Sequence, residues 1–363
     1  MTTSAQRGHL AFCAYDTALA DADFDPTAGK FIWQRHKALR VELAPQEFAD
    51  ILPFEVGEQI YPTGTYKMGA FAGGTFVLQP RLSSAFGHLL YAVSGAQAVS
   101  ASGASYSGGT QFKPAADTTS IPWMALRRYV PAETGTGQTE YLIDCRMAAM
   151  TLTLPQMGIL TAECAVVGRK PLWDDSEDTT GTGFEDSTSL AMSCKTTVSL
   201  PGFSTPLGSA TGGKFTGAQI TIANGTTTPQ QEMILGSYHP DTFLPLSRSV
   251  SLRLIYKWKD SALYKHLWQQ AAASPQTHVD NEWKPNVVSG AVEITSTAVN
   301  NAPVGSHPYR LVFHSDNVDW TISSPMLAPG QMVQAELTGV VKAATTPWWM
   351  RLDNSVQGYT FGS

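Results

Sequence analysis

The sequence is poor in charged residues, and the charge it carries is mostly acidic. Only 15% of its 363 residues are Asp, Glu, Lys or Arg, with 24 basic against 30 acidic side chains and a formal net charge of −6. A protein that grips nucleic acid needs a surplus of Lys and Arg for phosphate contacts, so this class is disfavoured. Hydrophobic residues reach 43%, and Gly, Ser, Thr and Pro are plentiful. Such a composition predicts a β-rich chain whose faces are buried against partners.

Long apolar runs and cysteine motifs are also missing. No stretch approaches the ~20 apolar residues of a membrane-spanning helix, and the polar segment 1–7 is unlike a secretory signal. We therefore expect neither membrane attachment nor export. The four cysteines form no C-x-x-C pair, which disfavours a zinc or redox site and predicts buried, reduced thiols. They are Cys13, Cys145, Cys164 and Cys194.

Catalytic and cofactor motifs are absent as well. None of the eight histidines belongs to an H-E-x-x-H or H-x-H pattern, and there is no G-K-[ST] phosphate loop. The segment 103–107 resembles a nucleophile elbow but lacks its closing glycine. The acidic run 174–178 lacks the spacing of a calcium loop. We expect no catalytic residue, no metal and no cofactor.

The strongest pattern present is the period-two alternation of β-strands. Segments 149–154 and 159–167 flank a Pro-Gln-Met-Gly turn and predict a hairpin. Segments 66–71 and 75–78 are predicted to be extended, with Gly73-Gly74 between them. Further strands are predicted at 37–43, 218–222, 250–256, 290–297, 309–313 and 332–342.

Two segments, 83–94 and 261–273, have the spacing of amphipathic helices. The first has Ser83 or Ser84 as a candidate N-cap and Gly95 after its last residue. Each helix follows a predicted strand, and the two helices lie about half a chain length apart. This arrangement points to an internal repeat.

The hairpins that follow the two helices also match in order. Asp144 corresponds to Asp316, and after a slip of one residue Glu163 corresponds to Glu336. The chain is therefore predicted to hold two copies of one β-rich unit. The predicted boundaries are 1–172 for the first unit with an N-terminal arm, 173–194 for an acidic linker rich in Gly, Thr and Ser, 195–346 for the second unit, and 347–363 for a C-terminal arm.

The C-terminal arm contains Trp348 and Trp349. A free tail rarely keeps two adjacent tryptophans, so we expect this arm to dock on a protein surface.

The order of a strand, a long polar loop, two strands, a helix and a hairpin ending in Val166-Val167-Gly168-Arg169-Lys170 resembles a known family. It is similar to the tail tube (major tail) proteins of long-tailed, non-contractile, siphovirus-type bacteriophages, here in a tandem two-domain form. The resemblance implies a mainly β fold with two tandem β-barrel or β-sandwich units, each flanked by one α-helix. The segments that carry it are 64–91, 140–170, 218–268 and 316–342.

The resemblance also implies a structural role in the virion. Trimeric, pseudo-hexameric rings would stack into a hollow tube through which the genome leaves, assembled in the cytoplasm of the bacterial host. The implied partners are further copies of the chain, the tail tip or baseplate, the tape measure protein, the tail terminator and, in passage, double-stranded DNA.

Candidate site residues follow from the same resemblance. The long loop that reaches the neighbouring ring falls at 46–64 and 224–248, and the ring-to-ring candidates are Glu55, Glu58, Tyr61, Tyr238, Asp241 and Phe243. A negative bore repels phosphates and prevents sticking. The candidate bore residues are Glu163, Glu336, Asp144 and Asp316. Ordinary solvated strand positions are an equal alternative for these four, because a face cannot be assigned without a sheet register.

Three other functions stay open. A tail terminator or baseplate ring of the same fold would form single rings that do not stack. A secreted β-sandwich module could bind carbohydrate through Trp348 and Trp349. A β-rich hydrolase would need a pocket that gathers a histidine and a carboxylate.

Overall fold

Sixteen β-strands, one α-helix and one short 3-10 helix make up the described part of the computed structural model. The structure describes residues 8–15, 18, 33–51, 65–83, 85–99, 109–116, 121–133, 136–174, 189–200, 215–257, 288–298, 309–323, 329, 333–354 and 359. The protein is mainly β, as the alternation predicted.

The strands of the first half run from β1 to β9. They are β1 (His9–Tyr15), β2 (Gln34–His36), β3 (Ala38–Ile51), β4 (Thr65–Leu78), β5 (Gly95–Val99), β6 (Gly109–Pro114), β7 (Trp123–Val130), β8 (Gln138–Leu154) and β9 (Thr161–Asp174). The helix α1 (Phe86–Ser94) lies between β4 and β5.

The strands of the second half run from β10 to β16. They are β10 (Ala191–Ser199), β11 (Phe215–Thr226), β12 (Pro245–Lys257), β13 (Val288–Ala298), β14 (Arg310–Ile322), β15 (Gln334–Val341) and β16 (Trp349–Asp353). The 3-10 helix η4 (Pro229–Glu232) lies between β11 and β12.

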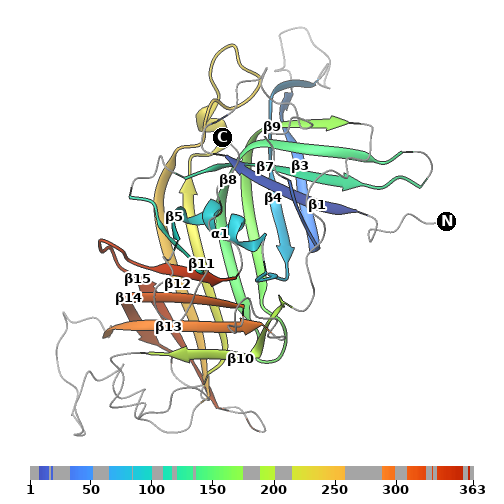
Figure 1. Ribbon diagram of the computed structural model, residues 1–363. Helices are drawn as coiled ribbons and strands as arrows, with labels where there is room; N and C mark the ends of the chain where they lie inside the picture. Colours follow the sequence, from blue (N-terminus) through green and yellow to red (C-terminus); the bar gives the residue numbers. More distant parts are fainter. Residues whose placement is uncertain are drawn as a thin grey trace, which may run out of the picture.

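Eight long strands form the central sheet of the molecule (Figure 1). Their order is β3-β4-β9-β8-β11-β12-β15-β14, and every neighbouring pair is antiparallel. The first four strands come from the first half of the chain and the last four from the second. Residues 149–154 of β8 pair with 218–223 of β11, so the two four-stranded sheets join edge to edge.

The two halves share irregularities of register as well as strand order. A β-bulge adds a residue to one strand of a pair and is a specific structural feature rather than a random defect. Three bulges or register shifts recur at matching places: Ala38/Arg40 with Phe215/Gly217, Phe48/Ala49 with Gly225/Thr226, and Met124/Leu126 with Gly290/Val292. Strands β3, β4, β9 and β8 therefore occupy the places that β11, β12, β15 and β14 occupy in the second half.

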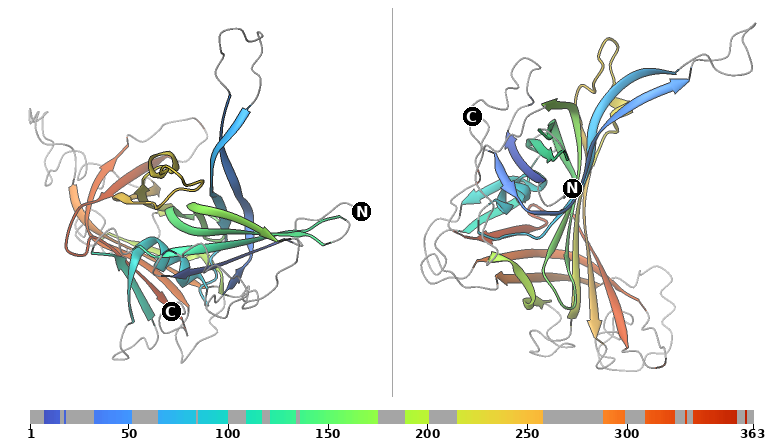
Figure 2. Two further views of the ribbon diagram at one scale, coloured as in Figure 1. Left: turned by 90° about the horizontal axis from the view of Figure 1, so that it is seen from above. Right: turned by 90° about the vertical axis from the view of Figure 1, so that its right-hand side faces the viewer.

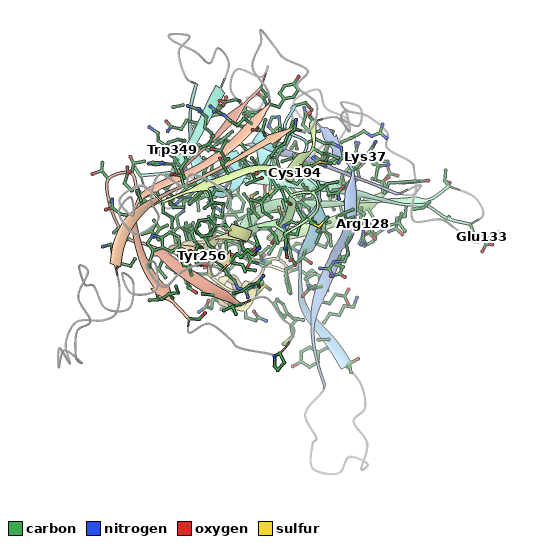
Figure 3. All side chains as sticks on the ribbon, turned by 90° about the horizontal axis from the view of Figure 1, so that it is seen from below. Lys37, Arg128, Glu133, Cys194, Tyr256 and Trp349 are labelled. Carbon is green, nitrogen blue, oxygen red and sulfur yellow. The ribbon has the colours of Figure 1, made fainter. Side chains whose placement is uncertain are left out.

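A second layer covers one face of the central sheet. In the first half it contains α1 and strands β1, β2 and β7, and in the second half β13 and β10. Figure 2 shows α1 and β1 on one side of the long strands. The core between the layers is built from alternate residues of the sheet, such as Leu152, Ile220 and Leu254, which are at most 3% exposed. The β7–β8 hairpin, with Glu133 near its tip, projects on the side away from Trp349 (Figure 3).

Several predicted elements are confirmed. Strands β8 and β9 form the predicted hairpin, and the other predicted strands fall within β3, β11, β12, β13, β14 and β15 or overlap them. Strands β1, β2, β5, β6, β7, β10 and β16 were not predicted. The segments 66–71 and 75–78 are extended as predicted, and Gly73-Gly74 between them continue the same strand β4, paired with β3 and β9. Gly74 has φ +138°, and a Cβ there would lie 2.0 Å from the carbonyl oxygen of Glu42, so glycine permits close strand packing rather than a turn.

Helix α1 ends as predicted and begins differently. Gly95 adopts the left-handed conformation with φ 87° and caps the C-terminus. The N-cap is Ala85, which has no side-chain capping bond, and the Ser83 hydroxyl instead bonds the hydroxyl of Ser189 at 3.0 Å. Ser84 and the whole second predicted helix, 261–273, lie outside the described residues.

The cysteine prediction holds for three of the four thiols. Cys13, Cys145 and Cys164 are buried and free, and burial raises the pKa of Cys13 to about 12. Cys194 is exposed, because it lies in β10 at the margin of the second layer. No helix in the described ranges is long and apolar enough to cross a membrane.

Candidate functional site

The face of the central sheet that the second layer leaves uncovered is a candidate surface. Its side chains alternate with those of the core and are small or polar, with Ala149, Thr151 and Thr153 on β8 opposite Gln219, Thr221 and Ala223 on β11. The hydroxyls of Thr151 and Thr221 lie 3.3 Å apart across the junction. We call this surface the open face.

Charged side chains on the open face are mostly paired with one another. A guanidinium nitrogen of Arg40 lies 3.5 Å from Glu163 and another lies 3.5 Å from Glu42. Lys342 lies 2.8 Å from Asp319. These pairs neutralise much of the charge on the described face.

Glu163 and Glu336 occupy the same place in the two halves. Glu163 on β9 faces Val77 on β4, and Glu336 on β15 faces Ile255 on β12. Arg253 donates to Glu336 at 2.6 Å, and this hydrogen bond lowers the pKa of the carboxyl. The structure therefore places both carboxylates on the open face, where they were predicted to correspond.

Asp144 and Asp316 do not occupy the same place. A bulge between Met147 and Ala149 in β8 has no counterpart in β14, so the equivalent of Asp144 is Asn317. Asp316 is exposed on the other side of β14, 2.9 Å from His314.

Asp144 is buried, at 3% exposure, with φ +50°. Its carboxylate accepts from the Tyr15 hydroxyl at 2.8 Å and from Arg169 at 2.9 Å. Burial, and then the Asp144 charge, raise the pKa of Tyr15 well above its ordinary value. Asp144 thus belongs to an internal network and is withdrawn from the candidate bore residues.

The segment 227–244 between β11 and β12 folds back on the first half. The Ala70 amide donates to the Tyr238 carbonyl at 2.9 Å, and Arg169 Nε donates to the Pro240 carbonyl at 3.0 Å. Phe243 is fully buried in a cluster with Tyr141 and other first-half side chains.

Among the predicted ring-to-ring residues, only some are at a surface. Tyr238 is 44% exposed and Asp241 is also exposed, whereas Phe243 fills the first-half cluster and is not available for such a contact. Glu55, Glu58 and Tyr61 lie outside the described residues.

The two C-terminal tryptophans pack against their own chain. Trp348 is 3% exposed with its ring stacked on Phe313, and Trp349 stacks on His314 with ring centroids 4.8 Å apart. Strand β16 then pairs with β14 on one side and β6 on the other. The expected docking arm is therefore a strand that links the two halves, and it offers no exposed pair of rings for a sugar.

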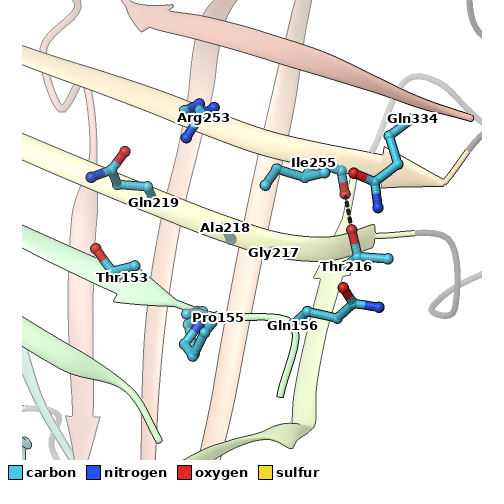
Figure 4. A pocket seen from close by; sticks show the side chains of 11 residues that line it. Thr153, Pro155, Gln156, Thr216, Gly217, Ala218, Gln219, Arg253, Ile255 and Gln334 are labelled. Atoms are coloured by element: carbon cyan, nitrogen blue, oxygen red, sulfur yellow. Dashed lines mark hydrogen bonds between the residues drawn. The ribbon is translucent and has the colours of Figure 1, made fainter. Parts of the chain in front are cut away.

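No described site has the make-up of an active centre. A shallow pocket of about 190 Å³ opens where β8 and β12 end and β11 begins (Figure 4), and Arg253 is the one ionisable group among its lining residues. The Thr216 hydroxyl there donates to the Ile255 carbonyl at 3.4 Å. No cluster of three or more His, Cys, Asp or Glu suited to a metal occurs in the described ranges.

The sequence was compared with known protein families and with curated proteins. The profile described as phage tail tube protein matches residues 55–345, which is most of the chain. No curated protein matches. The chain therefore belongs to the family of phage tail tube proteins, which are structural, non-enzymatic components of the virion tail.

Proposed function

We propose that the chain is a tandem duplication of one tube unit and that three copies close into a pseudo-hexameric ring. The shared strand order and the three matching bulges support the duplication. Two units in each chain supply the six repeats of a ring from three copies.

The observation that carries the proposal is the junction between β8 and β11. It joins the first half to the second through 149–154 and 218–223. On β3 the counterpart of 218–223 is 41–46, because Val41 faces Phe76 as Ala218 faces Leu254. Among the described strands, β3 pairs with β4 alone, so this edge has no neighbour.

The complementary edge lies on β14. Ile322 on β14 faces Leu337 on β15 as Met150 on β8 faces Cys164 on β9. The segment of β14 that corresponds to 149–154 of β8 therefore begins at Thr321. The described part of β13 pairs with β14 only as far as Trp320. Pairing of β14 with β3 of the next copy therefore repeats the junction already present within the chain. Such a head-to-tail contact gives a ring when its rotation closes.

Exposed apolar side chains support stacking of these rings. Tyr66 and Met68 on β4 are 41% and 49% exposed, and their counterparts, Leu244 just before β12 and Leu246 on β12, are 49% and 64% exposed. Large apolar side chains at equivalent positions of both halves would recur six times around one end of a ring. An apolar surface of this kind fits a further copy of the ring.

The open face is proposed to line the bore. Many of its side chains are small or hydroxyl-bearing, and Arg40, Arg253 and Lys342 are each paired with a carboxylate, so few positive charges remain to bind phosphates. Double-stranded DNA would pass along it without sticking. Glu163 and Glu336 are the proposed bore carboxylates, with Asp319 as a third. The siphovirus type and the tip, tape measure and terminator partners are proposed from the resemblance alone.

Native mass spectrometry and negative-stain electron microscopy of the purified protein test the proposal. Stacked rings of three copies with an open bore are expected. Single rings that never stack would favour a tail terminator or baseplate ring instead. A protomer that stays monomeric at high concentration and with a tail-tip nucleator would refute the assembly.

A further inference from the structure

One contact made in the first half has no described equivalent in the second half. In the first half, segment 227–244 lies beside β4 at Ala70, beyond the point where β9 stops pairing with β4 at Ala72. We call this place the first receiving site. Its two contributors are the outward-facing backbone of Ala70 and the Arg169 side chain, which bind Tyr238, His239 and Pro240.

The second half has the same place in the same register. Arg248 faces Asn224 across β11–β12 as Ala70 faces Glu47 across β3–β4. Because the register is the same, the amide and carbonyl of Arg248 also point away from the hairpin partner. Strand β15 pairs with β12 only from Ser251 onward, so no described strand lies beside Arg248 on that side.

The cation of the first receiving site also has a counterpart. Arg169 follows the last residue of β9 that pairs with β4, and Lys342 follows Val341, the equivalent residue of β15. Arg169 is held by Asp144 and Lys342 by Asp319. Each cation is therefore anchored by a carboxylate at the border of its site.

The guanidinium of Arg248 is buried without acceptors among the described residues. Its Nε, Nη1 and Nη2 atoms have almost no accessible surface, and none has a hydrogen-bond partner in the described structure. A buried guanidinium without acceptors is costly to the folded chain.

We propose that Arg248 and Lys342 form a second receiving site, beside Ser247, which the loop 52–64 of the neighbouring copy in the ring occupies. The inference rests on the proposed ring. The loop 52–64 joins β3 to β4 as 227–244 joins β11 to β12, and β3 of that copy is the strand that pairs with β14. In the sequence, Tyr61-Pro62 precedes β4 as Tyr238-His239-Pro240 precedes β12. Docking is thus lateral, within one ring, and the Pro62 carbonyl takes the place of the Pro240 carbonyl.

Cross-linking of assembled protein tests the proposal. In a Cys194→Ser background, Tyr61→Cys with Ser247→Cys is treated with a short bismaleimide, and each single-cysteine variant is the control. The reference pair is Tyr238→Cys with Lys67→Cys in one chain, where the Tyr238 carbonyl accepts from the amide of Ala70, three residues after Lys67. Linking the reference pair should change the electrophoretic mobility of the monomer without producing dimers or larger species.

The pair across copies should give linked dimers and trimers, and the ladder should stop at the number of copies in a ring. A ladder that continues beyond this number would place the loop between rings and overturn lateral docking. Linkage within single chains, or no linkage in intact tubes, would overturn it too. Microscopy of the same sample before cross-linking reports separately on the proposed assembly, so absence of tubes counts against the ring and not against this contact alone.

Arg248→Met is the second test, because methionine keeps much of the bulk and removes the unpaired charge. We expect the protomer to unfold at no lower denaturant concentration than wild type, while the concentration needed for tube formation rises about tenfold. Equal assembly of the variant and wild type would remove Arg248 from the receiving site.

Discussion

Truncation of Phe243 should release the segment 227–244 from the first half of the protein. The ring is fully buried among Tyr15, Trp123, Tyr141 and other first-half side chains. Removing a buried phenylalanine costs roughly 3–5 kcal/mol through lost burial and the cavity left behind. Each of the nearby hydrogen bonds from Ala70 and Arg169 adds about 1 kcal/mol if the segment undocks. We expect Phe243→Ala to lower the free energy of unfolding of the protomer by at least 3 kcal/mol.

Urea unfolding of dilute protomer measures this loss, and limited proteolysis reports on the segment itself. The variant should be cleaved within 233–241 much faster than wild type, because a docked backbone resists proteases. Leu246→Ala is the matched control, since Leu246 is 64% exposed on the same hairpin and its truncation should stay within about 0.5 kcal/mol. A Phe243→Ala protein with near-wild-type stability and unchanged cleavage would refute the anchoring role of this ring.

Three further outcomes are expected. Gly87→Ala should cost about 1–3 kcal/mol, because a Cβ there would lie 2.0 Å from the ring of Tyr359, and most of this cost should vanish in a Tyr359→Ala background when both are unfolded in urea. Asp144→Asn should lower the free energy of unfolding in urea by roughly 3–5 kcal/mol, because Arg169 loses its buried carboxylate. A loss as small as that of an exposed ion pair would contradict this role of Asp144. Burial lowers the pKa of His36 to about 4, so the folded state resists protonation; stability should be full above pH ~6.5 and fall by up to about 3 kcal/mol as the pH drops to ~4, and His36→Gln should flatten this slope in thermal melts.

Local patterns in the sequence were sufficient for the long hairpins. Strands β8 and β9 are joined by a turn with clear Pro and Gly signals, so their pairing follows from neighbouring residues. The match between Glu163 and Glu336 also holds, because both lie at the same register position of β9 and β15.

Features that depend on distant contacts could not be predicted. The match of Asp144 with Asp316 fails through one bulged residue in β8, and a bulge leaves no sure mark in the alternation. Trp348 and Trp349 look exposed in a polar tail, but β16 finds partners in β14 and β6. Phe243 lies in a loop by sequence and is buried only because the loop folds onto the other half.

Strand β16 also bears on when the protein can complete its fold. It follows the other fifteen described strands in the chain, yet it closes the edges of β6 from the first half and β14 from the second. Contacts of such large sequence separation form late and slowly. The first half therefore keeps an unpaired β6 edge until β16 has left the ribosome. A nascent chain that still lacks β16 exposes the edges of both β6 and β14.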